Sequence, residues 1–317
     1  MTLDAQAKAI LDQIARSPMP KLHQVPASVA RQMFEISCKL TEIKNLPIGR
    51  VEDRVIPGPD DTELPIRIYT PVAAPPGPLP VLVFFHGGGF VIGSLDSHDA
   101  PCRLIANEAR CLVVSVDYRL APENRFPAAV DDCLAAVTWV ARNAAEINAD
   151  PTRIAVGGDS AGGNLSAVVS QQLRDAGGPK IVFQLLIYPA TDALHEGLSR
   201  TSNAEGYMLD KDLMSWFFAQ YLGDGGGVDL ADPRFSPLRH ANLGNLGTIH
   251  VVVAGFDPLR DEGIAYAEAL KAAGNKVTLS EFKGQIHGFC SMAGVIEAGR
   301  TALVEGAALL KEAFAQA

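Results

Sequence analysis

Hydrophobic runs alternate with longer helical stretches along the chain from about residue 80 to the C-terminus. The runs are short and rich in β-branched residues, which is typical of buried strands, and the stretches between them suit helices. Strands separated by helices predict right-handed β-α-β units and a mostly parallel sheet with helices on both faces. The expected strands are 80–85, 112–116, 154–156, 181–187, 249–254 and 276–282. The expected helices are 101–109, 127–143, 164–176, 259–273 and 295–315.

The N-terminal part of the chain has a different pattern. Two amphipathic segments, about 3–16 and 27–40, predict helices separated by a proline-interrupted link. Segments 51–56 and 64–69 alternate between apolar and polar residues on either side of a Pro-Gly-Pro-Asp-Asp turn, so we expect a β-hairpin. A proline-rich surface loop, 71–80, then leads into the main sheet.

A long interval, 189–245, interrupts the alternation of strands and helices. It contains an aromatic-rich helix near 213–218 and a glycine run at 225–227. Long insertions between strands commonly lie above a sheet as lids or binding surfaces. The pattern therefore predicts a single domain with a helical cap. The domain is 1–317, and the cap is formed from about 1–48 and about 190–245.

Composition and charge narrow the classes of partner. The chain has 27 Lys and Arg against 36 Asp and Glu, a net charge of −9, which argues against nucleic acid or an anionic membrane as the main partner. Its five cysteines form no C-x-x-C pair, and its first residues lack a basic start followed by an apolar stretch, so we expect a cytoplasmic protein with reduced thiols. No apolar run approaches the ~20 residues that span a bilayer.

Ser160 stands between glycines where one expected strand ends and a helix follows. A sharp turn there would hold the serine in a strained conformation, and Gly158 and Gly162 would remove side chains that collide with neighbouring backbone. The helix would direct its positive end at the serine, where negative charge develops during acyl transfer. Because a G-x-S-x-G pattern can arise by chance in a chain with 29 glycines, a plain strand-helix turn is the alternative.

A second glycine-rich stretch, His86-Gly87-Gly88-Gly89-Phe90, directly follows the expected strand 80–85. Its amides can approach a substrate oxygen closely and, together with the amide of Ala161, predict an oxyanion hole. A simple loop and a phosphate cradle are the alternatives. The cradle is disfavoured because neither a following Lys with Ser or Thr nor the G-x-G-x-x-G spacing occurs.

A serine nucleophile needs a base, and the base needs an acid that orients it. Asp257 and His287 follow the expected strands 249–254 and 276–282, in the order serine, acid, histidine. Both positions lie at carboxyl ends of parallel strands, where sites form in open α/β sheets. Asp261 is a rival acid, four residues later, and is expected on the following helix.

The remaining histidines are weaker candidates for the base. Four of them lie in the expected cap or before the serine, and the fifth lies inside a strand. They are His23, His195, His240, His98 and His250. The acidic and histidine cluster at 96–99 lacks a partner motif, so no metal site is expected.

These motifs together resemble the hormone-sensitive-lipase-like family of α/β hydrolases, also called bacterial esterase family IV. The resemblance covers most of the chain and rests on five motifs in the family's order. They are His86-Gly87-Gly88-Gly89-Phe90, Asp117-Tyr118-Arg119-Leu120-Ala121-Pro122-Glu123, Gly158-Asp159-Ser160-Ala161-Gly162-Gly163, Gly255-Phe256-Asp257-Pro258-Leu259-Arg260-Asp261 and His287-Gly288-Phe289.

The resemblance implies an α/β-hydrolase fold and a carboxylesterase that uses no cofactor. It implies a triad of Ser160, Asp257 and His287, an oxyanion hole and a cap that matches the two segments named above. The implied oxyanion donors are the amides of Gly88, Gly89 and Ala161. In this family the histidine at position 86 shapes the glycine loop and is not the base.

Two other functions remain open from the sequence. Amide or peptide hydrolysis uses the same triad, and a non-catalytic small-molecule receptor uses the same fold but lacks the catalytic histidine, which is present here as His287. Bulky residues of the expected cap predict a preference for short- to medium-chain acyl esters. These residues are Met33, Phe34, Trp216, Phe217 and Tyr221. Trp216, Phe217 and Phe218 could instead anchor a helix in the core. An exposed edge strand at 276–282 could pair two subunits in a homodimer.

Overall fold

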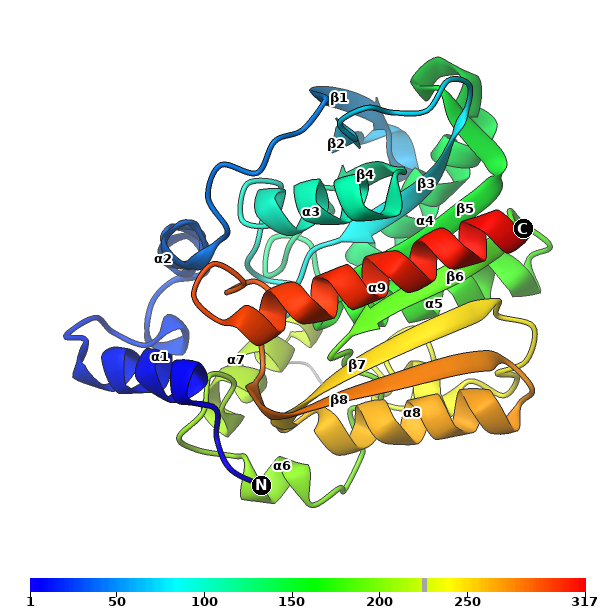
Figure 1. The fold of residues 1–317 in the computed structure, drawn as a ribbon. Helices are drawn as coiled ribbons and strands as arrows, with labels where there is room; N and C mark the ends of the chain where they lie inside the picture. The colour runs from blue at the N-terminus through cyan, green and yellow to red at the C-terminus, as the bar shows by residue number, and fades with distance from the viewer. Residues whose placement is uncertain (224–226) are drawn as a thin grey trace.

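The structure is a computed structural model that describes residues 1–223 and 227–317 (Figure 1). Most of the predicted glycine run therefore lies outside the described residues. The strands are β1 (Arg50–Pro57), β2 (Glu63–Thr70), β3 (Leu79–Phe85), β4 (Leu112–Val116), β5 (Ala149–Asp159), β6 (Ile181–Ile187), β7 (Thr248–Phe256) and β8 (Lys276–Ile286). The α-helices are α1 (Ala5–Arg16), α2 (Ala27–Thr41), α3 (Asp99–Ala109), α4 (Ala128–Arg142), α5 (Ala161–Asp175), α6 (Ser199–Ser202), α7 (Lys211–Leu222), α8 (Arg260–Ala272) and α9 (Glu297–Gln316).

The strands of the described residues form one sheet in the order β1-β2-β4-β3-β5-β6-β7-β8. β1 and β2 pair as the predicted antiparallel hairpin, with Arg50 opposite Thr70, and β2 is also antiparallel to β4. All other neighbouring strands run parallel. The predicted fold class, a mostly parallel sheet with helices on both faces, is confirmed.

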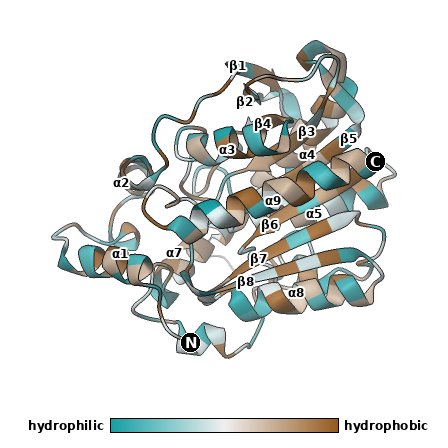
Figure 2. Cartoon of the chain, in the orientation of Figure 1, coloured by the Kyte–Doolittle hydropathy of each residue, from teal (hydrophilic) through white to brown (hydrophobic). Residues whose placement is uncertain are grey.

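Alternate residues of the central strands face two separate hydrophobic cores. In β3, Val83 and Phe85 face one core and Phe84 faces the other. The central strands β3, β4, β6 and β7 are almost entirely buried, whereas the helices mix hydrophilic and hydrophobic residues (Figure 2). Helices α3 and α9 pack side by side on one face, and α4, α5 and α8 cover the other (Figure 1). Burial on both faces explains why these strands are continuous apolar runs.

Three strands extend further toward the site than the sequence predicts. β5 continues to Asp159, β7 to Phe256 and β8 to Ile286. Gly255 belongs to a strand that approaches its neighbour closely, because a Cβ at this position in β7 would collide with the carbonyl of Lys283 in β8. Glycine in a strand can mark such a close approach as well as a turn.

The loops that follow β3, β5, β7 and β8 meet at one edge of the sheet. Helices α1, α2, α6 and α7 lie beside this edge, so the N-terminal segment and the insertion come together in space (Figure 1). Lys21 joins them through an ion pair with Asp210 at 2.9 Å. In the described part of the chain, no helix combines the length and hydrophobicity needed to cross a membrane.

Candidate active site

Ser160 stands at the turn between β5 and α5. Its backbone angles, φ 54° and ψ −114°, are rare for residues other than glycine. A Cβ at Gly158 or at Gly162 would collide with the carbonyl of Phe85 in β3. The structure therefore has the strained turn and the close backbone contacts that the sequence predicts around this serine.

Three side chains from separate loops form a hydrogen-bonded chain at this turn. Nε2 of His287 lies 2.9 Å from Oγ of Ser160, and Nδ1 of His287 lies 2.7 Å from Oδ2 of Asp257. The second oxygen of Asp257 accepts the amide hydrogen of Leu259 at 2.8 Å, and the aspartate is fully buried. This arrangement can move a proton from the serine to the histidine while the carboxylate orients the imidazole ring.

The rival residues have other partners. Asp261 lies on α8, as expected, where its carboxylate accepts the amide hydrogen of Ser199 at 2.8 Å. His250 lies inside β7, where Nε2 is 2.9 Å from Oγ of Ser280. Neither belongs to the hydrogen-bonded chain at Ser160.

The glycine loop after β3 presents backbone amides beside the serine. Gly88 and Gly89 have φ of 124° and 59°, and a Cβ at Gly88 would collide with the carbonyl of Ile92. Within residues 1–223 and 227–317, neither amide donates to a protein acceptor. The amide of Ala161 opens helix α5 and so has no carbonyl one turn earlier to bond. These three amides can serve as donors to a substrate oxygen.

His86 supports this glycine loop from beneath. Its ring is fully buried, stacks on Tyr118 with 4.3 Å between centroids, and has Nδ1 2.8 Å from the carbonyl of Gly87. Burial, with a smaller contribution from nearby His98, lowers the pKa of His86 to about 3. The ring is therefore neutral near pH 7 and packs as an uncharged group between Tyr118 and the glycine loop.

Asp159 is a residue for which the sequence predicts no role. Its Oδ1 accepts the amide hydrogen of Gly87 at 2.8 Å and lies 3.1 Å from Nε2 of His98. Burial raises the pKa of this carboxyl, but His98 and the Gly87 amide outweigh burial and hold the pKa below its usual value. The residue lies in the quoted Gly-Asp-Ser-Ala-Gly motif, which was the available signal. Asp96, grouped with His98 in the sequence, instead pairs with Arg67 at 2.7 Å.

Asn203 is a second residue that the sequence did not indicate. Its side chain donates hydrogen bonds to the carbonyls of Asp257 at 3.1 Å and of Gly255 at 3.3 Å. It comes from the insertion, directly after α6, and is buried. The insertion therefore holds the loop that carries Asp257. No spacing or motif connects these positions, because the contact arises only from folding.

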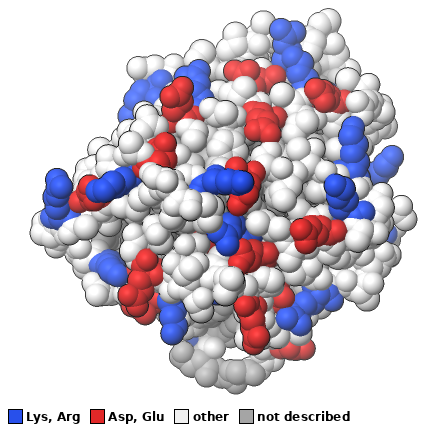
Figure 3. Space-filling view, turned by 60° about the horizontal axis from the view of Figure 1, so that its bottom comes forward, with Lys and Arg blue, Asp and Glu red and all other residues white. Residues whose placement is uncertain are grey.

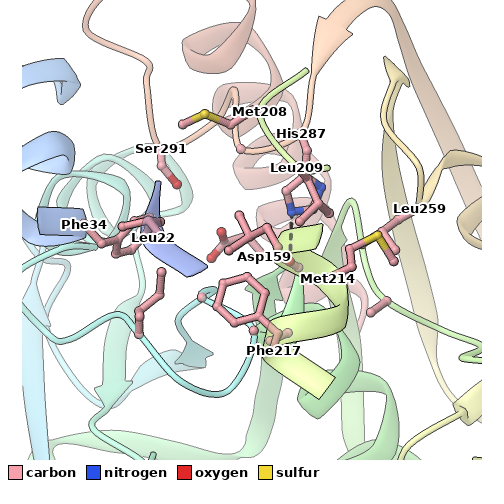
Figure 4. Close-up of a pocket in the computed structure, with 18 of the residues that line it drawn as sticks. Leu22, Phe34, Asp159, Met208, Leu209, Met214, Phe217, Leu259, His287 and Ser291 are labelled. Atoms are coloured by element: carbon pink, nitrogen blue, oxygen red, sulfur yellow. Dashed lines mark hydrogen bonds between the residues drawn. The ribbon is translucent and has the colours of Figure 1, made fainter. Parts of the chain in front are cut away.

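A cavity of about 150 Å³ opens above Ser160 and His287 (Figure 4). Most of its wall is apolar. The N-terminal segment contributes Leu22 and Phe34, and the insertion contributes Met208, Leu213 and Phe217. The walls of this cavity thus come from segments that are distant in sequence.

The sequence prediction of the cavity wall was partly wrong. Phe34 and Phe217 line the cavity, as does Phe218, but Met33, Trp216 and Tyr221 do not. Tyr221 is buried and stacks on Phe90 with 4.0 Å between ring centroids. Tyr221 therefore packs in the core and not in the wall of the cavity.

Comparisons with known proteins agree with this geometry. A family model described as the alpha/beta hydrolase fold matches residues 82–291. A carboxylesterase of Mycobacterium tuberculosis is 46% identical over 273 residues, which cover 85% of this chain and 84% of that protein. An arylesterase of Saccharolobus solfataricus is 39% identical over 289 residues, 89% of this chain and 92% of that protein.

Solved structures of esterases match the whole fold. A hyperthermophilic esterase from the archaeon Pyrobaculum calidifontis is 41% identical with a TM-score of 0.93, covering 98% of this chain and 99% of that chain. An ester hydrolase from the metagenome of Lake Arreo is 42% identical with a TM-score of 0.96, covering 99% and 100%. The chain therefore belongs to the α/β-hydrolase family, in its hormone-sensitive-lipase-like group.

Proposed function

We infer that the protein is a serine carboxylesterase in which Ser160 is the nucleophile, His287 the general base and Asp257 the acid that orients the base. The observation that carries this inference is the hydrogen-bonded chain of 2.9 Å and 2.7 Å between these residues at the floor of an apolar cavity. The sequence is 46% and 39% identical to those of two ester hydrolases over most of its length, and this similarity supports the same reaction.

The reaction begins when Nε2 of His287 takes the proton of Ser160 and Oγ attacks the ester carbonyl carbon. The carbonyl electron pair moves to the oxygen, which the amides of Gly88, Gly89 and Ala161 stabilise; losing one such donor typically costs about 10²–10³ in rate. When the intermediate collapses, the alcohol leaves with the proton from His287, and the acyl group remains on Ser160.

Water then attacks the acyl-enzyme by the same route. His287 takes a proton from the water and returns it to Ser160 as the carboxylic acid departs. Asp257 keeps the imidazole oriented and stabilises its cationic form in both halves of the reaction. Every proton transfer uses His287, so the chemistry requires no cofactor.

The cap that we propose consists of about 1–48 and about 190–245. Both segments contribute walls to the cavity, and the ion pair between Lys21 and Asp210 joins them. A cavity of about 150 Å³ lined by Phe34 and Phe217 suits short- to medium-chain acyl groups. We therefore expect activity to decline toward palmitoyl esters.

The test is hydrolysis of p-nitrophenyl esters from acetate to palmitate by the unmodified protein and by Ser160→Ala and His287→Ala. Each substitution should lower kcat by about 10⁶, because the triad acts as a unit. Ser215→Ala and His240→Gln, which change the same residue types away from the cavity, should retain activity. An unmodified protein inactive on all esters, or variants that retain their rates, would contradict the proposal. Activity that rises to palmitate would contradict the chain-length preference.

Two further proposals concern the state of the protein in the cell. All five cysteines are free and buried, which suits a cytoplasmic protein.

β8 lies at the edge of the sheet, where its outer side can pair with the same strand of a second copy to form a homodimer. Sedimentation equilibrium tests the dimer, and a monomer at micromolar concentration would contradict it.

A further inference from the structure

The cavity above Ser160 contains a carboxylate that the ester-hydrolysis mechanism does not use. Asp159 lines the cavity beside Ser160 and His287, and Figure 4 shows its side chain among the apolar lining residues. Among the lining residues that the structure describes, it is the only acidic residue, and neither lysine nor arginine is present.

The charge of Asp159 is held in place by the fold. Oδ1 accepts the amide hydrogen of Gly87 at 2.8 Å and lies 3.1 Å from Nε2 of His98, and the residue is 6% exposed. Asp159 lines the cavity, whereas His98 does not. The same contacts that keep the pKa of Asp159 low keep it ionised near neutral pH.

We propose that Asp159 makes this enzyme select ester substrates by charge, rejecting acyl groups that carry a carboxylate and accepting neutral or cationic ones. A substrate carboxylate would lose its hydration in an apolar cavity whose described lining residues include neither lysine nor arginine. It would also be repelled by a fixed like charge at short range, where water screens poorly. An ammonium group loses hydration as well, but Asp159 compensates part of that loss. This inference rests on the esterase activity proposed above.

Two pairs of ethyl esters separate charge from shape. Ethyl hydrogen succinate carries a carboxylate, and ethyl 4-methylpentanoate replaces that carboxylate with an isopropyl group of similar size. Ethyl 4-trimethylammoniobutyrate carries a cation, and ethyl 5,5-dimethylhexanoate is its neutral counterpart. The quantity measured is the ratio of kcat/KM for the charged ester to that for its neutral counterpart, at pH 7.5 and low salt.

Asp159→Asn keeps an acceptor for the Gly87 amide while it removes the charge. We expect this variant to raise the ratio of the anionic pair about tenfold or more and to lower the ratio of the cationic pair by a similar factor. Damage to the site lowers both members of a pair together, so only loss of a charge moves the two ratios in opposite directions. Ser291→Ala, which changes an uncharged polar residue of the same cavity, should leave both ratios unchanged.

Ratios that stay constant in Asp159→Asn, or that move in the same direction, would overturn the charge selection. If that variant does not fold, the unmodified enzyme still decides, because its ratio for the anionic pair must be at least about tenfold below its ratio for the cationic pair. The reverse order, or equal ratios, would overturn the inference. An unmodified protein that hydrolyses neither neutral ester would instead contradict the esterase activity on which the inference rests.

Discussion

At the scale of single residues, glycines determine how closely the turn at Ser160 approaches the glycine loop 86–90. Gly162, in the first turn of α5, faces the carbonyl of Phe85, the residue directly before His86. A side chain there would push β3 and the following amides away from Ser160. The requirement is steric, because a helical residue at this position has no need of unusual backbone angles.

Gly162→Ala should therefore lower both stability and activity. We expect a loss of about 1–3 kcal/mol in the free energy of unfolding, from overpacking, and a reduced kcat at a temperature where the variant is fully folded. Urea denaturation and p-nitrophenyl butyrate hydrolysis measure the two effects. Gly244→Ala is the matched control, since its added Cβ meets no atom closer than 3.4 Å. Full activity in Gly162→Ala would show that the glycine loop tolerates the displacement.

At the scale of elements, the insertion supports the loop that carries Asp257 and also forms part of the cavity wall. Ser199 and Asn203, at either end of α6, donate hydrogen bonds to the carbonyls of Pro258 and Asp257 at 2.8 Å and 3.1 Å. Arg200 pairs with the buried Glu262 at 2.5 Å. The loop carrying Asp257 is thus fixed from one side by β7 and from the other by the insertion.

Asn203→Ala should lower kcat about tenfold with little change in KM, because the loop that positions Asp257 loses two hydrogen bonds while the cavity wall keeps its side chains. Steady-state kinetics with p-nitrophenyl butyrate measures the two constants separately. Asn242→Ala removes an asparagine of the same insertion whose hydrogen bonds are local, and it should behave as the unmodified protein. A rise in KM with unchanged kcat would show that Asn203 supports the cavity wall and not the loop that carries Asp257.

At the scale of the whole molecule, buried neutral histidines make the fold sensitive to acid. Burial lowers the pKa of His86 to about 3 and the pKa of His250 to about 4. In the unfolded chain both histidines take up a proton near their ordinary pKa of 6.5. The unfolded state therefore binds more protons below that pH, and stability falls as the pH decreases from about 6.5 toward 4.

His250→Gln should weaken this pH dependence. The free energy of unfolding of the variant should fall less steeply between pH 6.5 and 4.5, by roughly 1.4 kcal/mol per pH unit, than that of the unmodified protein. Urea denaturation at several pH values measures the slope. Above pH 7, where the histidine is neutral in both states, the two curves should run parallel. Equal slopes below pH 6 would exclude His250 as a cause of acid sensitivity.

Charges of both signs are mixed on the face of the molecule shown in Figure 3. On the face shown in Figure 3, lysine and arginine are interspersed with aspartate and glutamate, and no broad basic patch covers that face. With a net charge of −9, this pattern suits our expectation that nucleic acid is not a partner.

The sequence by itself determined which strands and helices follow one another along the chain and the chemistry of the motifs, because both depend on local patterns. Periodicity shows which faces of a strand are buried, and Ser160, Asp257 and His287 each follow a strand in the order of a known family. Strand ends were less predictable, since the glycines in β7 and β5 reflect close packing between strands.

Only the tertiary structure decided which residues line the cavity and which residues support Asp257. Asn203 supports Asp257, Tyr221 packs inside the core, and Asp159 places a charge in an apolar cavity. Each of these contacts joins segments that are remote in sequence or depends on the direction of one side chain. Local sequence patterns do not predict such contacts, because the contacts form only when segments distant in sequence come together in the folded chain.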